Sequence, residues 1–95
     1  MLKLLSIKRT PGGTKEFKAI FRVGERDKIV RFGTSSNYVL NPKRTDDDRL
    51  NYLKRHRKNE KWGEPLTAGS LSRWILWESR SLDENIKNFK RRFKL

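Results

Sequence analysis

Residues 17–33 have the sequence FKAIFRVGERDKIVRFG, and this stretch decides the fold. Between residues 17 and 23, phenylalanine, alanine and valine alternate with mainly basic positions, which is the pattern of a strand with one buried face. Residues 24–27 predict a turn, and residues 28–32 predict the next strand, which ends at Gly33. Because the connection is short, we expect the two strands to pair in the antiparallel direction.

A further strand is expected upstream of this hairpin. The run at residues 2–8 mixes leucine and isoleucine with lysine, and the sequence TPGGT at residues 10–14 is a turn signal. Gly12 and Gly13 lack the Lys-Ser/Thr of a phosphate-binding loop, so we interpret them as part of that turn. Residues 1–33 therefore predict a three-stranded antiparallel meander, which needs a covering layer on one face.

Three helices are expected to supply that layer, at residues 45–59, 67–79 and 82–94. In the first helix, Thr45 can cap the N-terminus. Leu50 and Leu53 are expected to face inward, with Tyr52 as a further inward candidate. The second helix is apolar over much of its circumference, which is typical of a central helix.

The third helix has the clearest pattern. Ser81 and Glu84 have the spacing of a capping box, in which each side chain binds the backbone N–H of the other residue. One apolar stripe follows helical spacing and is formed by Leu82, Ile86, Phe89 and Phe93. The order of elements predicts an α+β fold in a single domain, residues 1–95, with a three-stranded antiparallel sheet followed by three helices packed on one face.

The chain carries 24 lysines and arginines against 11 acidic residues, which gives a formal net charge of +13 over 95 residues. It also has three tryptophans and five phenylalanines, whereas a disordered basic tail is poor in aromatic residues. The charge is therefore expected on a folded surface, and such a surface suits a polyanionic partner, most often nucleic acid. An ordinary solvated surface with a high pI is the alternative interpretation.

Other features of the composition exclude several classes of function. The chain has no cysteine, so disulfides, thiolate zinc sites and thiol chemistry are excluded. No apolar run approaches the roughly 20 residues that span a bilayer, and the start of the chain does not have the pattern of a secretory signal. We therefore expect a protein that is not secreted, does not associate with membranes and functions inside a cell or in a particle assembled there.

The best candidate for a binding surface is a set of basic residues on the outer faces of the first and third predicted helices. They are Arg55, Arg57, Lys58, Lys87, Lys90, Arg91 and Arg92. Arginine and lysine neutralise phosphates and release counterions, so this surface is expected to bind nucleic acid with little dependence on sequence. Lys18, Arg22 and Arg31 of the predicted strands add further cations, on the face opposite the apolar one.

Aromatic residues offer a second route to nucleic acid, because exposed rings stack on bases. Trp74 and Trp77 fit the apolar pattern of the second helix, so core packing is favoured over stacking. Trp62 lies in a link, where both interpretations stay open. Tyr38 lies in a polar loop and is the best candidate for an exposed aromatic residue, with a loop anchor as the equal alternative.

Two features resemble parts of a catalytic site. His56 is the single histidine and has neither sulfur ligands nor a second imidazole to complete a metal site, so packing at a helix end or contact with a phosphate is expected instead. Asp46, Asp47 and Asp48 could bind Mg²⁺ in a nuclease, but helix capping explains them without a metal. We therefore expect no catalytic site, no enzymatic activity, no metal and no cofactor.

A series of motifs runs through the chain: FG at 32–33, RH at 55–56, W at 62, TAGSLSRWILW at 67–77, SL at 81–82 and FKRRF at 89–93. Over about residues 17–93 this series resembles a family of small basic proteins encoded by nucleocytoplasmic large DNA viruses, the giant viruses. The resemblance implies a location in the virion or in a host-cell viral factory. It implies nucleic acid, expected to be DNA, or acidic virion proteins as partners. A minor capsid or virion structural protein is therefore the second functional hypothesis.

Overall fold

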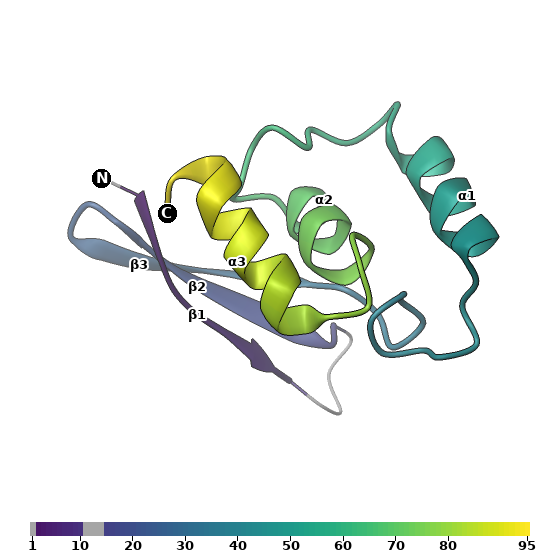
Figure 1. Cartoon of the computed structure of the whole chain (residues 1–95). Helices are drawn as coiled ribbons and strands as arrows, with labels where there is room; N and C mark the ends of the chain where they lie inside the picture. Colours follow the sequence, from purple (N-terminus) through teal and green to yellow (C-terminus); the bar gives the residue numbers. More distant parts are fainter. Residues whose placement is uncertain (1, 11–14) are drawn as a thin grey trace.

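The computed structural model describes residues 2–10 and 15–95 and confirms the α+β class. Its elements, in chain order, are β1 (Leu2–Arg9), β2 (Phe17–Val23), β3 (Arg26–Phe32), α1 (Asp46–His56), α2 (Ala68–Leu71), η1 (Ser72–Leu76) and α3 (Leu82–Phe93). Figure 1 shows the arrangement of the strands and of the helices α1 to α3. The element η1 is a π-helical turn that continues α2. Residues 11–14 of the predicted turn, with Gly12 and Gly13, lie outside the described residues.

The three strands form one antiparallel sheet in the order β1-β2-β3. Val23 pairs with Arg26, so the connection between β2 and β3 is a two-residue turn of Gly24 and Glu25. Gly24 has a φ of +64°, which suits the first position of such a hairpin turn. The turn predicted at residues 24–27 is therefore too long, and β3 begins earlier than expected.

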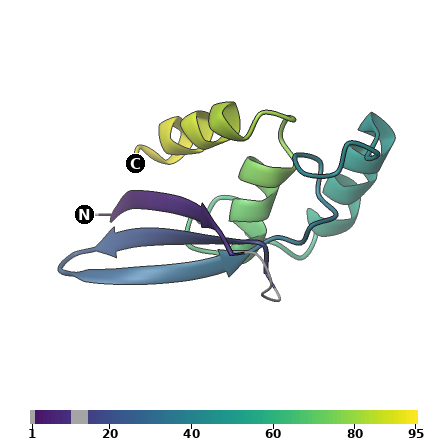
Figure 2. The same cartoon turned by 90° about the horizontal axis from the view of Figure 1, so that it is seen from below.

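The helices α2 and α3 cover one face of the sheet, and α1 lies beyond the end of β3 on the same side (Figures 1 and 2). The core between the two layers consists mainly of buried side chains of the strands, α2, η1 and α3: Leu4, Phe17, Ala19, Phe21, Phe32, Leu71, Ile75, Leu76 and Phe89. Gly33 closes β3 with a φ of +83°, and a Cβ there would lie 2.3 Å from Leu76 Cδ1. Only glycine therefore fits where the strand end meets the helices.

Within the described residues, no helix is long and apolar enough to cross a membrane.

The inward face of α1 differs from its prediction. Leu50 is 56% exposed, so its expected place in the core is wrong. Tyr52 is buried, because its ring stacks on Trp77 with the two centroids 4.1 Å apart. Leu53 is half-buried and packs against the core, as expected. The helix contacts the core along one edge, since it lies beyond the sheet, and Leu50 points away from that edge.

The single helix predicted over residues 67–79 is wrong in its geometry, because α2 passes into η1 and the helix ends before Trp77. The buried side chain of Asn85 supplies the physical reason. Its Nδ2 donates to the carbonyls of Ile75 and Ser79, both at 2.8 Å, which satisfies these groups without a further helical turn. The chain can therefore leave the helix at Trp77 and turn back into α3.

The predicted apolar stripe of α3 packs against the core through Leu82, Ile86, Phe89 and Phe93. Ser81 Oγ accepts from the Glu84 N–H at 3.3 Å, as in the predicted capping box. The second contact of that box is replaced, because the Ser81 N–H donates to Ser79 Oγ at 3.3 Å. Both α1 and α3 end earlier than predicted, at His56 and Phe93.

Candidate nucleic-acid interface

The outer face of α3 presents the first group of predicted binding residues. Lys87 and Arg91 lie two positions on either side of the buried Phe89, so both are roughly 200° around the helix from it and point away from the core. Lys90 and Arg92 are exposed as well. Within residues 2–10 and 15–95, none of the four basic side chains forms an ion pair with a carboxylate.

Arg92 is held in a defined position although it is exposed. Its guanidinium carbon lies 3.6 Å from the centroid of the Trp74 ring, and that of Arg73 lies 4.1 Å from it. Trp74 Nε1 donates to the Trp62 carbonyl at 2.9 Å, and the half-buried ring packs against the core. Both guanidinium groups therefore form favourable cation–π contacts with the Trp74 ring. Because the two arginines cover the ring, it is not free to stack on a base.

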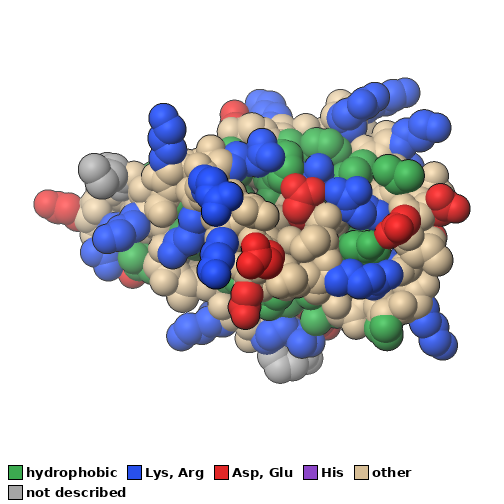
Figure 3. Space-filling view, viewed as in Figure 1, with side chains coloured by type: hydrophobic (Ala, Val, Ile, Leu, Met, Phe, Trp, Pro, Cys, Tyr) green, Lys and Arg blue, Asp and Glu red, His purple; other side chains and the backbone are tan. Residues whose placement is uncertain are grey.

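The second group lies at the C-terminal end of α1. Arg55, Arg57 and Lys58 are exposed, and none of them forms an ion pair in the described part of the chain. In Figure 1, α2 lies between α1 and α3, and Figure 3 shows acidic side chains between the basic ones over α3 and those over α1. The structure thus places the seven predicted residues in two groups rather than in one continuous patch.

Lys18, Arg22 and Arg31 alternate along their strands with buried residues and therefore lie on the face of the sheet that the helices leave open. Figure 2 shows this open face below the helices. Arg22 pairs with Asp27 across the hairpin and also forms an ion pair with its carboxylate. Lys18 and Arg31 lie directly opposite each other on adjacent strands. This surface is separate from both helical groups.

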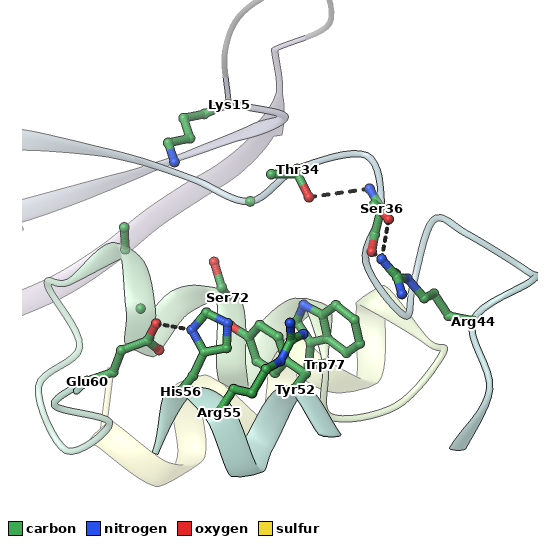
Figure 4. Close-up of a pocket in the computed structure, with 13 residues that line it drawn as sticks. Lys15, Thr34, Ser36, Arg44, Tyr52, Arg55, His56, Glu60, Ser72 and Trp77 are labelled. Carbon is green, nitrogen blue, oxygen red and sulfur yellow. Dashed lines mark hydrogen bonds and ion pairs between the residues drawn. The ribbon is translucent and has the colours of Figure 1, made fainter. Parts of the chain in front are cut away.

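A pocket of about 340 Å³ lies between the end of the sheet, the loop after β3, α1 and α2 (Figure 4). The cations that line it are Lys15, Arg44 and Arg55. Figure 4 also shows the Ser72 hydroxyl and the His56 ring facing this space. Sequence analysis missed Lys15 and Arg44 as site residues. No local pattern could have shown them, because only the tertiary structure brings these distant residues to one cavity.

Three stacked rings form one wall of this pocket. The centroids of His56 and Tyr52 are 4.2 Å apart, and those of Tyr52 and Trp77 are 4.1 Å apart. The Arg44 guanidinium lies 5.6 Å from the centroid of Trp77. Trp77 is buried, which confirms core packing over base stacking for this residue. Burial also raises the pKa of the Tyr52 hydroxyl above its ordinary value.

Glu60 is the carboxylate of the pocket, and both of its oxygens are engaged. His56 Nδ1 lies 2.6 Å from Glu60 Oε1, and Trp62 Nε1 donates to Oε2 at 3.0 Å. A Cβ at Gly69 would lie 2.9 Å from the carboxylate, so glycine allows it to pack against α2. Because Glu60 is bound to His56 and Trp62, it forms no ion pair with Lys15, Arg44 or Arg55 in the described part of the chain.

Tyr38 is 8% exposed, so of the two interpretations that the sequence left open, the exposed aromatic residue is wrong. Its hydroxyl donates to Asp46 Oδ1 at 2.5 Å, and the Arg80 guanidinium lies 4.1 Å from its ring centroid. The hydrogen bond to Asp46 raises the pKa of Tyr38. The alternative interpretation, a loop anchor, is the one that the structure supports.

The aspartates at the start of α1 serve as a cap and an anchor. Asp48 accepts from the Thr45 N–H at 2.9 Å, and this bond lowers the pKa of Asp48. The stability that it contributes is present above the unfolded pKa of about 3.9 and is lost as the pH falls through the lower folded value. Asp46 binds Tyr38, as described above. Among the residues that the structure describes, no group of three His, Cys, Asp or Glu side chains is placed to hold a metal ion.

No family model matches this chain, and no curated protein or solved structure shows significant similarity to it. The viral family and the location implied by the motif series therefore stay predictions. Function has to be inferred from the charge and geometry of the described residues.

Proposed function

We propose that this chain is a nucleic-acid-binding protein that contacts mainly the phosphate backbone, with DNA as the expected target. The observation that carries the proposal is the state of the seven predicted cations, which are exposed and, within the described residues, free of ion pairs. Arg49 and Arg73 differ from them, because both are partly buried and paired with Glu78. The exposed cations have no such structural partner, and a bound polyanion would relieve their mutual repulsion.

The expected mode of binding is electrostatic and largely independent of sequence. Each phosphate contact releases condensed counterions and contributes about −0.9 to the slope of log K against log[salt] for duplex DNA. Six contacts would therefore give a slope near −5, by the same rule. Base readout is not expected from Trp74 or Trp77, because Trp77 is buried and Trp74 is covered by arginines.

A salt titration tests the proposal. Fluorescence anisotropy measures the affinity of the full chain for a labelled duplex and for a single strand at several salt concentrations. The double variant Lys87→Glu/Arg91→Glu reverses two outward charges of α3 without touching the Trp74 platform. We expect it to weaken binding to duplexes of different sequence by the same factor, at least tenfold at low salt, and to reduce the salt slope by about 2.

The matched control is Arg26→Glu/Lys28→Glu, which changes the net charge equally at the exposed end of the β2–β3 hairpin. A smaller loss of affinity in this control shows that position matters and not only total charge. Binding that ignores salt, or an affinity that is unchanged in the α3 variant, contradicts the proposal.

The virion structural protein is the second candidate. Leu50 favours it, because this leucine is 56% exposed beside a hollow of about 820 Å³ that Leu53 and Trp62 also line. Protein interfaces commonly have an apolar centre of this kind. Fractionation of particles separates the two candidates, since release with the genome supports nucleic-acid binding and retention in shells without DNA supports the structural role.

A further inference from the structure

The open face of the sheet has an unusual arrangement of charge. Figure 2 shows the helices on one side of the sheet, while the other side is left free by the described part of the chain. Ile29 on this side is 51% exposed, which agrees with the absence of a covering layer. The side chains on this face are therefore available to a partner.

The strand register places three cations in one row across this face. Lys8 of β1 pairs with Lys18 of β2, and Lys18 pairs with Arg31 of β3. Directly paired residues project from the same side of a sheet, and adjacent strands lie about 4.8 Å apart, so the row spans roughly 10 Å. The sequence shows Lys18 and Arg31 as outward cations, but Lys8 joins them only through the register, which a β-bulge between Leu4 and Ser6 sets.

This row, Lys8–Lys18–Arg31, is unfavourable in the free protein. Like charges directly opposite on adjacent strands destabilise a sheet. Within residues 2–10 and 15–95, none of the three has a carboxylate partner, whereas Arg22 on the same face is paired with Asp27. The row lowers the stability of the free protein and has no carboxylate partner in the described part of the chain. Such a row suits the binding of an anion from another molecule.

The chemistry of the row favours phosphates over an acidic protein. Two of its three members are lysines, which are depleted in protein–protein interfaces but common in contacts to phosphate. The neighbouring row of the face, Ser6–Ile20–Ile29, contains no aromatic side chain to act as a protein hot spot or to stack on bases. Of the three kinds of contact, with an acidic protein, with bases or with the sugar-phosphate backbone, the row therefore best fits the backbone.

We propose that the row Lys8–Lys18–Arg31 on the open face of the sheet is a second binding site for the phosphodiester backbone of nucleic acid, distinct from the helical surface. This inference rests on the proposed function and adds a site to it. The site binds phosphates without reading sequence, and binding removes the repulsion among the three cations.

The test compares two triple variants with the native chain in the same salt titration. The row variant is Lys8→Gln/Lys18→Gln/Arg31→Gln. We expect its affinity for duplex DNA to fall and its salt slope to lose about 3, because each contact contributes about 0.9. Its melting temperature at low salt is expected to be at or above that of the native chain, since a repulsive row has been neutralised.

The matched variant is Arg26→Gln/Lys28→Gln/Lys43→Gln, which removes the same charge from other exposed positions. It is expected to lose less than 1 from the salt slope. A native chain that binds no nucleic acid contradicts the proposed function as a whole. Binding by the native chain with an equal slope in the row variant overturns the sheet site alone. Tighter binding of poly-glutamate than of DNA, lost in the row variant, overturns it in favour of an acidic protein partner.

Discussion

Individual buried polar residues shape this fold as much as the apolar core does. Asn85 is fully buried, and its side chain donates to two carbonyls and accepts from Ser79 Oγ at 2.5 Å. Asn37 is also buried, and its Oδ1 accepts from the N–H groups of Val39 and Leu40 at 2.9 Å. Both asparagines supply hydrogen bonds where the backbone leaves regular structure.

Asn85→Ala tests this role at the scale of one residue. The substitution leaves the carbonyls of Ile75 and Ser79 without their donor, so we expect the free energy of unfolding to fall by roughly 2–4 kcal/mol. Urea denaturation followed by tryptophan fluorescence measures the change. Asn88→Ala, on the exposed side of the same helix, is the control and is expected to cost less than about 0.5 kcal/mol. Equal effects at the two positions would show that burial of Asn85 is unimportant.

Among the helices, α1 is the one most weakly attached to the rest of the fold. Arg49 anchors this helix. The Arg49 Nε donates to the Trp77 carbonyl at 2.7 Å, and the Arg49 Nη2 pairs with Glu78 Oε1 at 2.9 Å. The stacking of Tyr52 on Trp77 is the second attachment. The exposed Leu50 contributes nothing to docking. The position of Arg55, Arg57 and Lys58 therefore depends on a small number of side-chain contacts, among which those of Arg49 and Tyr52 reach Trp77 and Glu78.

Arg49→Ala is expected to release α1 while the sheet and α3 stay folded. Hydrogen exchange followed by mass spectrometry would then show loss of protection in residues 46–56 and little change in residues 82–93. Lys54→Ala, exposed on the same helix, is the control and should leave protection intact. Equal deprotection of both helices in Arg49→Ala would mean that α1 is part of one cooperative core.

At the scale of the whole molecule, the cations lie on two opposite sides. α3 presents its outer cations away from the sheet, and the row Lys8–Lys18–Arg31 lies on the far, open face (Figure 2). If both surfaces bind nucleic acid as proposed, one chain would contact two nucleic-acid segments at once. One protein molecule would then link two segments, which we call bridging. A measurement of affinity for a single duplex does not detect bridging.

Bridging is expected in a bead assay, in which an immobilised duplex captures a second, labelled duplex only when the protein is present. Capture should rise with protein concentration and then fall when excess protein saturates each duplex separately. Neutralising either the α3 cations or the sheet row is expected to reduce capture by more than it reduces binding to a single duplex. Capture that survives both variants would contradict two-sided binding by one chain.

The accuracy of sequence-based prediction varied with the range of the interactions involved. The β2 strand and the stripe of α3 were predicted correctly, because their burial follows from local periodicity against a single layer. Leu50 was assigned wrongly, and for Tyr38 the sequence left an exposed ring and a loop anchor equally open. The exposure of Leu50 depends on where α1 lies, and the burial of Tyr38 depends on Arg80, which is 42 positions away in the chain. The division of the seven cations into two separate groups could not be predicted from the sequence either.

The sequence by itself determined the α+β class, the meander, the exposure of the seven predicted cations and the net charge of +13, because periodicity and composition are local or additive properties. The tertiary structure alone decided which cations share a surface. The β1–β2 register aligned Lys8 with Lys18, and the docking of α1 brought Arg55 to the pocket with Lys15 and Arg44. The physical reason is that register and docking are set by packing between segments far apart in the chain, which no single stretch of sequence encodes.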